Sequence, residues 1–369
     1  MISRRDRVSA SLPDFPWDTI AGARATAAAH PDGLVDLSVG TPVDQVDPLI
    51  RAALDAAAGF PGYPTTAGTP ELRAAAAAAL VRRYGAVGLG DDQVLPVIGT
   101  KEAIAGLCTQ LGLGGGDAVV IPKVAYPTYE VSAILAGAAV VRADDSGTAD
   151  RPDAAVVFLN SPSNPTGAVM GVEQMRAVLA WARDRGAVVV SDECYLGLGW
   201  EVEPVSVLDP RVCDGDVTGL IAVHSLSKIS NLASYRAGFF AGDAGLIAEL
   251  LAVRKHSGLM VPFPIQAAMT AALNDDRHVG EQADRYRARR AVLKPAVIEA
   301  GLRVDDSAAG LYLWATRDED ARVTHHWLAQ RGILAAPGDF YGPAGATHVR
   351  IALTASDEQI AQAARRLRG

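Results

Sequence analysis

Short apolar runs recur between residues 95 and 240 and alternate with stretches of helical pattern, which constrains the fold more than any other feature. The runs lie at residues 118–121, 138–141, 155–159, 187–190 and 220–223. A strand that is apolar on both faces belongs in a parallel sheet with helices on each side. Helical patterns at residues 101–111 and 172–185 lie between the runs. The sequence therefore predicts an α/β fold, with a mostly parallel, doubly wound sheet.

The pattern changes after this region, which indicates a second domain. A charged helical stretch at residues 281–297 interrupts the alternation, and residues 310–314 and 348–353 are typical of strands. A chain of 369 residues has enough material for two domains. The predicted division is a large domain at residues 46–285 and a smaller α+β domain at residues 1–45 and 286–369. We expect the proline-rich first 45 residues to be irregular.

Composition and charge exclude several classes of protein. The net charge of −8 opposes binding to nucleic acid or to an anionic membrane. No apolar stretch of about 18 residues is present, so no membrane span is expected, and no signal peptide is evident. The three cysteines, Cys108, Cys194 and Cys213, are too scattered for a disulfide framework or a zinc site. We therefore expect a cytoplasmic protein that acts on small molecules and holds no metal.

Polar residues follow three of the apolar runs. Asn164 comes after residues 155–159, and Asp192 comes after residues 187–190. Lys228, within the run His-Ser-Leu-Ser-Lys, follows residues 220–223. In a doubly wound sheet, ligands bind at the carboxyl ends of the strands. The sequence therefore predicts that these side chains share one binding site.

A phosphate group would find suitable partners among nearby residues. Proteins hold phosphate with N–H groups at a helix start, with hydroxyls and with a bidentate arginine. The candidates are the N–H groups of Thr100 and Lys101, the hydroxyls of Ser225 and Ser227, and the guanidinium of Arg236. The Gly-Thr turn before the helix, taken alone, is more often only a helix cap.

The remaining candidates suit the ring and the aldehyde of pyridoxal phosphate. A carboxylate such as Asp192 keeps the pyridine nitrogen protonated, which makes the ring an electron sink. Asn164 and Tyr195 are candidate partners of the phenolic oxygen, and Tyr126 is a candidate to stack on the ring. Lys228 is interpreted as a Schiff-base lysine whose pKa is lowered by burial and by Arg236. Core packing for Tyr126 and a helix cap for Asp192 remain alternatives.

The spacing of Asn164, Asp192, Tyr195, Lys228 and Arg236 resembles that of the class I/II aminotransferases, which are fold-type-I pyridoxal-phosphate enzymes. The resemblance extends over nearly the whole chain. It implies the fold-type-I architecture, an amino-group transfer between an amino acid and a 2-oxo acid, and a homodimer with the active site at the subunit interface.

The resemblance also implies roles for residues outside the predicted strand ends. It assigns Tyr63 to the phosphate of the neighbouring subunit, although a turn aromatic is the alternative reading. It assigns Arg350 to the substrate α-carboxylate, with help from Asn164 and the backbone of Gly40. Arg350 alternates with apolar residues, so it is expected on the strand face opposite the small-domain core. A solvated strand arginine is the alternative.

Residues 11–18 and 59–70 most resemble the actinobacterial-type N-succinyldiaminopimelate aminotransferases. This resemblance implies N-succinyl-LL-2,6-diaminopimelate as the amine, with 2-oxoglutarate and glutamate as the partner pair, in lysine biosynthesis. A long acidic substrate is expected to meet a second cation beyond Arg350, but the sequence does not select it.

Other functions remain open at this stage. An aminotransferase of different specificity or a cystathionine-type C–S β-lyase would share the same motifs. A nucleotide-binding module of doubly wound type is less favoured, because the chain has no G-x-G-x-x-G or P-loop motif. A regulator that senses pyridoxal phosphate would need a DNA-binding domain, and no helix-turn-helix-sized segment precedes residue 30.

Overall fold

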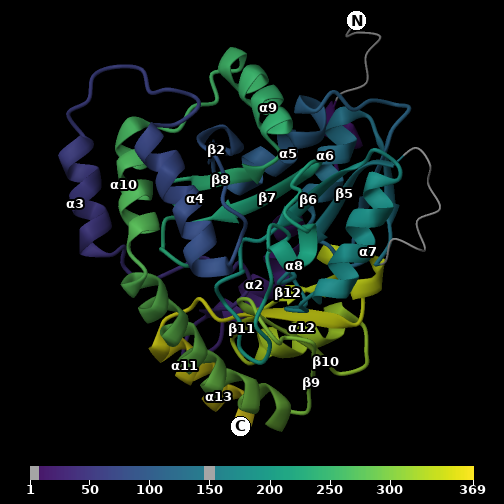
Figure 1. The fold of residues 1–369 in the computed structure, drawn as a ribbon. Coiled ribbons are helices and arrows are strands. Elements are labelled where there is room, and N and C mark those ends of the chain that lie inside the picture. The colour runs from purple at the N-terminus through teal and green to yellow at the C-terminus, as the bar shows by residue number, and fades with distance from the viewer. Residues whose placement is uncertain (1–7, 145–153) are drawn as a thin grey trace, which may run out of the picture.

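A central seven-stranded sheet organises the larger part of the molecule in the computed structural model, which describes residues 8–144 and 154–369. Within these residues the strand order is β2-β8-β7-β6-β5-β3-β4 (Figure 1). The strands are β2 (Val94–Ile98), β3 (Ala118–Ile121), β4 (Ala139–Arg142), β5 (Ala154–Asn160), β6 (Val188–Asp192), β7 (Leu220–Ser225) and β8 (Ala237–Gly242). The predicted apolar runs are therefore confirmed as strands.

The sheet is mostly parallel, as the sequence predicts, with one exception that the sequence did not reveal. β8 runs antiparallel to both β2 and β7, and its residues are fully buried. β4 also differs from the expectation of burial on both faces. It has one neighbour, β3, and it lies at the sheet edge, so its residues are exposed or half-buried.

Helices cover both faces of this sheet (Figure 1). One face packs against α5, α6 and α9, through residues such as Leu107, Tyr129 and Leu250. The other packs against α4, α7 and α10, through residues such as Leu80 and Leu179. The helices of this part are α3 (Pro48–Ala57), α4 (Pro70–Tyr84), α5 (Thr100–Gln110), α6 (Thr128–Ala136), α7 (Val172–Arg183), α8 (Pro210–Cys213), α9 (Ala244–His256) and α10 (Phe263–Asn274), with a short 3₁₀ helix at Asp91–Gln93.

A smaller sheet with the order β12-β13-β10-β9 is antiparallel throughout. Its core joins Leu313 and Ile351 of the sheet to Leu293, Leu328 and Ala363 of three covering helices. The elements are α11 (Arg277–Glu299), β9 (Arg303–Asp305), β10 (Tyr312–Thr316), α12 (Ala321–Gln330), β11 (Ile333–Leu334), β12 (Ala336–Pro337), β13 (His348–Ala352) and α13 (Asp357–Arg368), with 3₁₀ helices at Gly338–Tyr341 and Pro343–Gly345.

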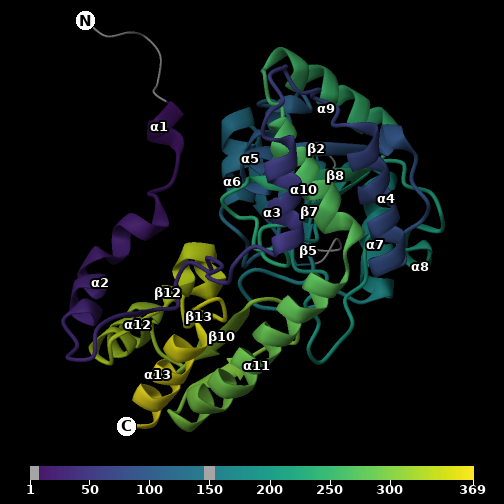
Figure 2. The same cartoon turned by 90° about the vertical axis from the view of Figure 1, so that its left-hand side faces the viewer.

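The expectation that the first 45 residues are irregular is wrong for the described part. They form α1 (Val8–Ser11), a 3₁₀ helix at Pro16–Ile20 and α2 (Ala21–Ala28), followed by β1 (Val35–Asp36). Alanine, which has the highest helix propensity, accounts for five of the eight residues of α2, and no proline lies within this helix. This segment lies along α12, and β1 pairs with β11 of the smaller part (Figure 2).

The predicted domain limits stay a prediction, and residue 285 lies inside the long helix α11. Among residues 8–144 and 154–369, no helix is both long and apolar enough to cross a membrane. The same residues contain no cluster of histidine, cysteine or acidic side chains that would hold a metal ion. All three cysteines are free. Cytoplasmic location stays a prediction.

Candidate active site

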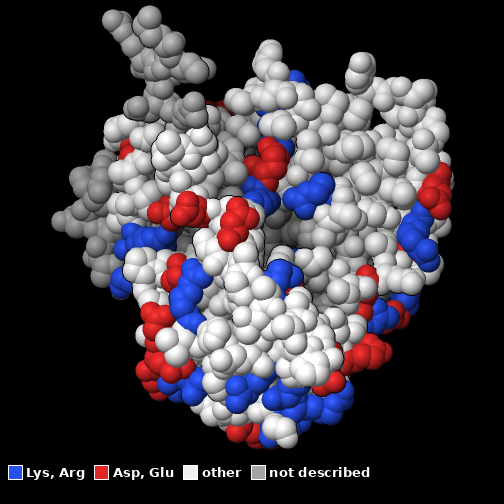
Figure 3. All heavy atoms as spheres, turned by 180° about the vertical axis from the view of Figure 1, so that it is seen from behind, with Lys and Arg blue, Asp and Glu red and all other residues white. Residues whose placement is uncertain are grey.

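The carboxyl ends of β5, β6 and β7 meet at one edge of the large sheet, because these three strands are parallel neighbours. A cavity of about 960 Å³ opens there, between the large sheet and the smaller part of the molecule. From behind, a hollow with basic side chains at its edge is visible between the two parts (Figure 3). Predicted site residues that line the cavity are Thr100, Lys101, Tyr126, Asn164, Asp192, Tyr195, Ser225, Ser227, Lys228, Arg236 and Arg350.

Lys228 lies on the loop after β7 and faces the cavity. Its Nζ donates to the carbonyl oxygen of Gly40 at 2.6 Å, and its own carbonyl accepts from the hydroxyl of Tyr286 at 3.1 Å. Burial, followed by the charges of Arg350 and Arg236, lowers the pKa of Lys228 below the ordinary lysine value. A larger fraction of this amine is therefore neutral near pH 7 than for a surface lysine.

Asp192 is the last residue of β6 and is buried. Its Oδ2 accepts from the hydroxyl of Tyr129 at 2.7 Å, and its Oδ1 accepts from the N–H of Cys194 at 3.1 Å. Burial raises the pKa of Asp192, and these hydrogen bonds offset part of that rise. Among the described residues no lysine or arginine pairs with Asp192, so this carboxylate suits an added cationic group.

Sequence reasoning missed two side chains that hold this edge of the sheet. Tyr129 lies on α6, and its contact with Asp192 depends on how this helix packs against the sheet, so the local sequence contained no signal for it. Asn160 accepts from the N–H of Asn164 at 2.7 Å and donates to the carbonyl of Asp192 at 2.9 Å. Its position at the end of an apolar run was the available signal.

Arg236 lies against the start of α5, where the sequence placed a phosphate. Gly99 precedes that helix with φ of +74°, and a Cβ on Gly99 would overlap the Arg236 guanidinium. The positive φ favours glycine at this turn, and the close approach shows that Arg236 lies directly against it. Arg236 donates to the carbonyl of Ala233 at 2.9 Å and has no carboxylate partner within the described residues. The arrangement leaves a cationic fork beside free helix N–H groups.

The two serines of the loop after β7 face the same place. Ser225 ends β7, and its Oγ accepts from the N–H of Ser227 at 3.1 Å. Both residues line the cavity. Their hydroxyls are therefore positioned to donate to an anion near Arg236.

Arg350 is buried on β13. The alternative reading, a solvated strand arginine, is therefore wrong. Val349 and Ile351 enter the small-domain core, whereas Arg350 lies on the opposite face, as predicted. Its guanidinium donates to Asn164 Oδ1 at 2.8 Å and to the Ser38 carbonyl at 2.5 Å. No carboxylate in the described residues pairs with it, and its Nε has no hydrogen-bond partner. A carboxylate ligand would supply the missing negative charge.

Two tyrosines form a further pair at this site. The hydroxyls of Tyr195 and Tyr312 lie 3.1 Å apart, and the Arg350 guanidinium lies 3.9 Å from the centroid of the Tyr312 ring. Tyr126 lines the cavity and packs edge-on against Tyr129, with ring centroids 5.7 Å apart. The sequence identified residues 310–314 only as a strand and so missed Tyr312.

Tyr63 does not join the cavity of its own chain. It lies between α3 and α4, and its side chain is 95% exposed. Its assignment to a neighbouring subunit stays a prediction.

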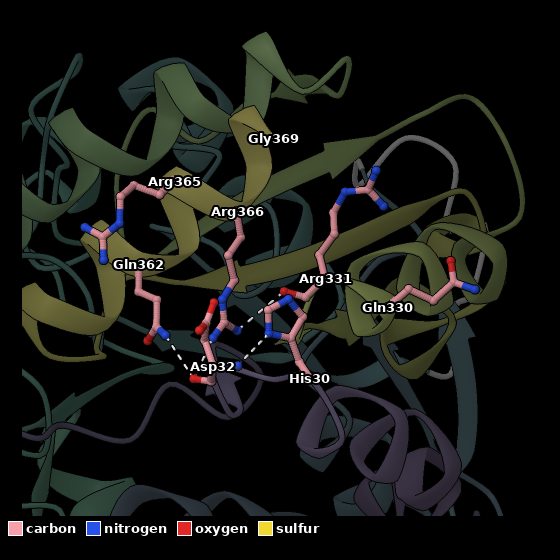
Figure 4. A pocket seen from close by; sticks show the side chains of 8 residues that line it. All are labelled: His30, Asp32, Gln330, Arg331, Gln362, Arg365, Arg366 and Gly369. Carbon is pink, nitrogen blue, oxygen red and sulfur yellow. Dashed lines mark hydrogen bonds between the residues drawn. The ribbon is translucent and has the colours of Figure 1, made fainter.

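A second hollow of about 600 Å³ lies at the far side of the small domain. It is lined by His30, Asp32, Gln330, Arg331, Gln362, Arg365, Arg366 and Gly369. Arg366 and Gln362 are tied to the carbonyl of Asp32, and Arg331 and Arg365 point away from each other (Figure 4). These side chains do not converge on one point, so the hollow lacks the organisation of the main cavity.

Comparison with known proteins identifies the family. A family model for the class I and II aminotransferases matches residues 32–367. A probable aminotransferase of Mycobacterium tuberculosis is 65% identical over 98% of this chain and 87% of that protein. A 4-dedimethylamino-4-oxo-anhydrotetracycline transaminase of Streptomyces rimosus is 56% identical over 96% and 99%. An LL-diaminopimelate aminotransferase of Dehalococcoides mccartyi is 32% identical over 97% of both chains.

Solved structures agree with these relatives. An aminotransferase from Neisseria meningitidis superimposes with a TM-score of 0.91, at 29% identity over 98% of this chain and 99% of that one. A probable N-succinyldiaminopimelate aminotransferase from Thermus thermophilus superimposes with a TM-score of 0.86, at 30% identity over 96% and 99%. The fold is that of a fold-type-I transferase. The chain belongs to the class I and II aminotransferases, which depend on pyridoxal phosphate.

The residues of the cavity fit this cofactor. Arg236 and the start of α5 suit its phosphate, and the buried carboxylate of Asp192 suits a protonated ring nitrogen. Lys228 offers a partly neutral amine, and Asn164 uses its Oδ1 for Arg350, which leaves its amide N–H groups to donate. Each part of the cofactor thus has a complementary group in this chain.

Proposed function

We propose that the chain holds pyridoxal phosphate in this cavity through Lys228, Asp192 and Arg236. The single observation that carries this proposal is that Lys228, Arg350 and the buried carboxylate of Asp192 face one cavity and have no oppositely charged side-chain partner among the described residues. Charges without a partner are costly in a protein interior unless a ligand supplies the opposite charge. The bound cofactor supplies an electron sink for the substrate α-carbon.

The chain's own residues then bind, orient and move a proton. Arg350 binds the substrate α-carboxylate, and Asn164, which accepts from Arg350, keeps the guanidinium in place. Lys228 would hold the aldehyde of the cofactor and, once released by the incoming amine, would carry the proton that leaves the substrate α-carbon, which the cofactor would acidify as an electron sink. Its lowered pKa supports this role, because a general base has to be unprotonated when it acts.

We further propose that one substrate carries a second anionic group and that Lys101 binds it. Lys101 lines the cavity, and its Nζ lies 5.3 Å from the centroid of the Phe15 ring. Within the described residues it has no carboxylate partner. Of the cavity-wall cations that have no role above, the two arginines are paired, Arg142 with Glu130 at 2.7 Å and Arg322 with Asp339 at 2.8 Å. Lys101 is therefore the cation most available to a distal carboxylate.

This second cation supports N-succinyl-LL-2,6-diaminopimelate as the amine, with glutamate and 2-oxoglutarate as the other pair, in lysine biosynthesis. The likeness to a probable N-succinyldiaminopimelate aminotransferase and to an LL-diaminopimelate aminotransferase supports the same class of substrate. A succinylated diamino acid is long and acidic, and the volume of the cavity accommodates such a chain.

A second candidate is a large polycyclic ketone. The relative from Streptomyces rimosus that is 56% identical is named for an anhydrotetracycline substrate. One wall of the cavity is apolar, with Phe15, Trp17 and Phe340 among its residues, and the rings of Trp17 and Phe340 pack edge-on at 5.4 Å. Such a wall suits flat aromatic rings better than it suits a succinyl chain.

We also propose a homodimer in which Tyr63 of each subunit completes the phosphate site of the other. The full exposure of Tyr63 in a single chain supports this assignment, since large aromatic side chains on protein surfaces mark contacts. Phe60, stacked on Phe263 at 4.1 Å, lies near it on the same exposed segment.

Steady-state assays separate these substrates. With 2-oxoglutarate as acceptor, N-succinyl-LL-2,6-diaminopimelate is expected to react with a higher kcat/KM than the unsuccinylated diamine. Lys101→Met keeps the backbone N–H and is expected to lower kcat/KM about tenfold for glutamate but little for alanine. An equal loss for both would contradict the role of Lys101. Faster amination of the tetracycline ketone than of any succinylated substrate would favour the second candidate.

A further inference from the structure

Tyr312 reaches the centre of the active site from the smaller part of the molecule. It lies on β10, opposite Ala352 of β13, and is 3% exposed. Its hydroxyl contacts the hydroxyl of Tyr195, which the sequence makes a candidate partner of the phenolic oxygen of the cofactor. None of the roles assigned above uses Tyr312.

Three neighbours fix where the Tyr312 hydroxyl lies. The guanidinium of Arg350 stacks on its ring at 3.9 Å, and the ring packs edge-on against that of Tyr195 with centroids 5.8 Å apart. On the third side is Gly40, where a Cβ would lie 2.7 Å from the Tyr312 hydroxyl oxygen. The φ of Gly40 is +73°, so glycine is favoured there both by conformation and by this close approach.

The hydrogen bond between Tyr312 and Tyr195 can run in either direction, because each partner is a hydroxyl. A phenolic hydroxyl has one proton to donate and lone pairs to accept with. Among the described residues, the Tyr195 oxygen is the sole hydrogen-bond partner of the Tyr312 hydroxyl. Arg350 and Lys228, the nearby cations, donate and do not accept. If Tyr312 gives its proton to the Tyr195 oxygen, the Tyr195 proton is left to be donated into the cavity.

We propose that Tyr312 is a positioning residue that donates to the Tyr195 oxygen and so aims the Tyr195 proton at the phenolic oxygen of the cofactor. Successive hydrogen bonds polarise one another, so the bond from Tyr312 also makes Tyr195 a stronger donor. This inference rests on the role proposed for Tyr195.

The charges around the pair favour this direction. The titratable groups that face Tyr312 are Arg350, Lys228, Tyr195 and Cys194. Burial alone would raise the pKa of Tyr312, but the charges of Arg350 and Lys228 outweigh it and lower that pKa. Burial and the neighbouring Tyr312 raise the pKa of Tyr195. The more acidic hydroxyl is the stronger donor, and Tyr195 keeps its proton.

The other tyrosines near Tyr312 do not disturb this arrangement. They are Tyr126, Tyr286 and Tyr341. Burial raises the pKa of Tyr126 to about 12 and raises the pKa values of Tyr286 and Tyr341 further. All three are therefore neutral near pH 7, and none shares a hydrogen bond with Tyr312.

A double-mutant cycle on the cofactor-loaded protein tests the proposal without turnover. Tyr312→Phe keeps the ring under Arg350 and removes only the hydroxyl. The measurement is the pH midpoint of the change in cofactor absorption, with no substrate present. Tyr312→Phe is expected to raise this midpoint by about half a pH unit, because the deprotonated form loses support from a weaker Tyr195 donor. Tyr195→Phe is expected to raise it further.

The cycle distinguishes an indirect role from a direct one. In the Tyr195→Phe background, adding Tyr312→Phe is expected to change nothing more, because Tyr312 acts through Tyr195. Tyr84→Phe removes the hydroxyl of a tyrosine whose ring stacks on His224, and Tyr84 does not line the cavity; it is the matched control and is expected to leave the midpoint unchanged. Additive shifts, or an unchanged midpoint in Tyr312→Phe, would overturn the proposal. An unchanged midpoint in Tyr195→Phe would instead reject the role of Tyr195 itself.

Discussion

Single residues of this site are informative because several charged side chains have no oppositely charged partner among the described residues. Asp192 is a buried carboxylate held by Tyr129 and by the N–H of Cys194, with no cationic partner among the described residues. Burial raises its pKa, and a protonated ring nitrogen would restore the charged form. A cationic group beside Asp192 and anionic groups beside Arg350 and Arg236 would therefore balance these charges.

Asp192→Asn is expected to reduce kcat by at least about a hundredfold, since a neutral amide does not keep the ring nitrogen protonated. Steady-state kinetics with glutamate measure this loss, and the absorption of bound cofactor confirms loading. Asp209→Asn is a matched control, because Asp209 is a buried carboxylate that caps α8 away from the cavity. Undiminished turnover of Asp192→Asn would mean that another group serves the ring nitrogen.

Arg350→Leu is expected to weaken binding of amino acids and 2-oxo acids about a hundredfold, because it removes a charge-assisted, two-point contact. Cofactor affinity is expected to change much less. Equilibrium titration with 2-oxoglutarate and with pyridoxal phosphate measures the two affinities separately. Arg176→Leu, which breaks a surface pair with Asp214, is the control. Equal losses for both ligands would contradict the carboxylate-binding role.

At the scale of elements, α11 connects the loop after β7, which carries Lys228, to the segment that follows Gly40. Tyr286 of this helix donates to the Lys228 carbonyl, and Arg289 bonds both oxygens of Asp44. Gln282 also donates to Asp44. Burial alone would raise the pKa of Asp44, but the hydrogen bonds from Arg289 and Gln282 hold it below its usual value of 3.8.

Asp44→Asn is expected to lower the free energy of unfolding near pH 7 by about 1–2 kcal/mol, because Arg289 stays buried with less compensation. The folded pKa of Asp44 lies below its unfolded value, so its contribution is present above the unfolded value and is lost as pH falls through the folded one. The difference in unfolding midpoint from wild type is therefore expected to shrink below about pH 4. A pH-independent difference would contradict this account. Asp318→Asn, in an exposed pair with Arg303, is the control.

The sequence predicted elements where periodicity was strong and missed those set by tertiary contacts. The apolar runs of β3, β5, β6 and β7 are unambiguous, and so are the helical patterns of α5 and α7. β8 has the sequence Ala-Gly-Phe-Phe-Ala-Gly, which has no clear period, and it is a strand because β2 and β7 pair with it.

The same contrast holds within the site. Asn164, Asp192 and Lys228 follow apolar runs, so their meeting at one sheet edge was predictable. Tyr312 and Tyr129 reach the site from elements whose placement depends on how helices and domains pack. Local sequence does not contain that information, and Lys101 likewise emerged as a free cation only once the pairing of Arg142 and Arg322 was known.

At the scale of the whole molecule, the proposed homodimer makes a prediction about shared sites. Tyr63→Ala and Lys228→Ala are each expected to be nearly inactive as pure proteins. A mixed dimer of the two contains one site with both Lys228 and the partner's Tyr63 intact. After denaturation and refolding of an equal mixture, about a quarter of wild-type activity is expected to return, because half of the dimers are mixed and each has one intact site.

Refolding each variant alone is the control for this experiment. No recovery in the mixture, with dimers confirmed by sedimentation, would show that Tyr63 does not act across the interface. Substantial activity of Tyr63→Ala alone would show that Tyr63 is not needed at either site.

The most direct test of the central claim is a half-reaction on the purified, cofactor-loaded protein. The absorption spectrum is followed while glutamate, N-succinyl-LL-2,6-diaminopimelate or cystathionine is added singly, without any 2-oxo acid. The account predicts that glutamate and the succinylated amine convert the pyridoxal form of the cofactor to the pyridoxamine form, and that Lys228→Ala does not. Release of pyruvate from cystathionine, without conversion by either amine, would contradict amino-group transfer at this site.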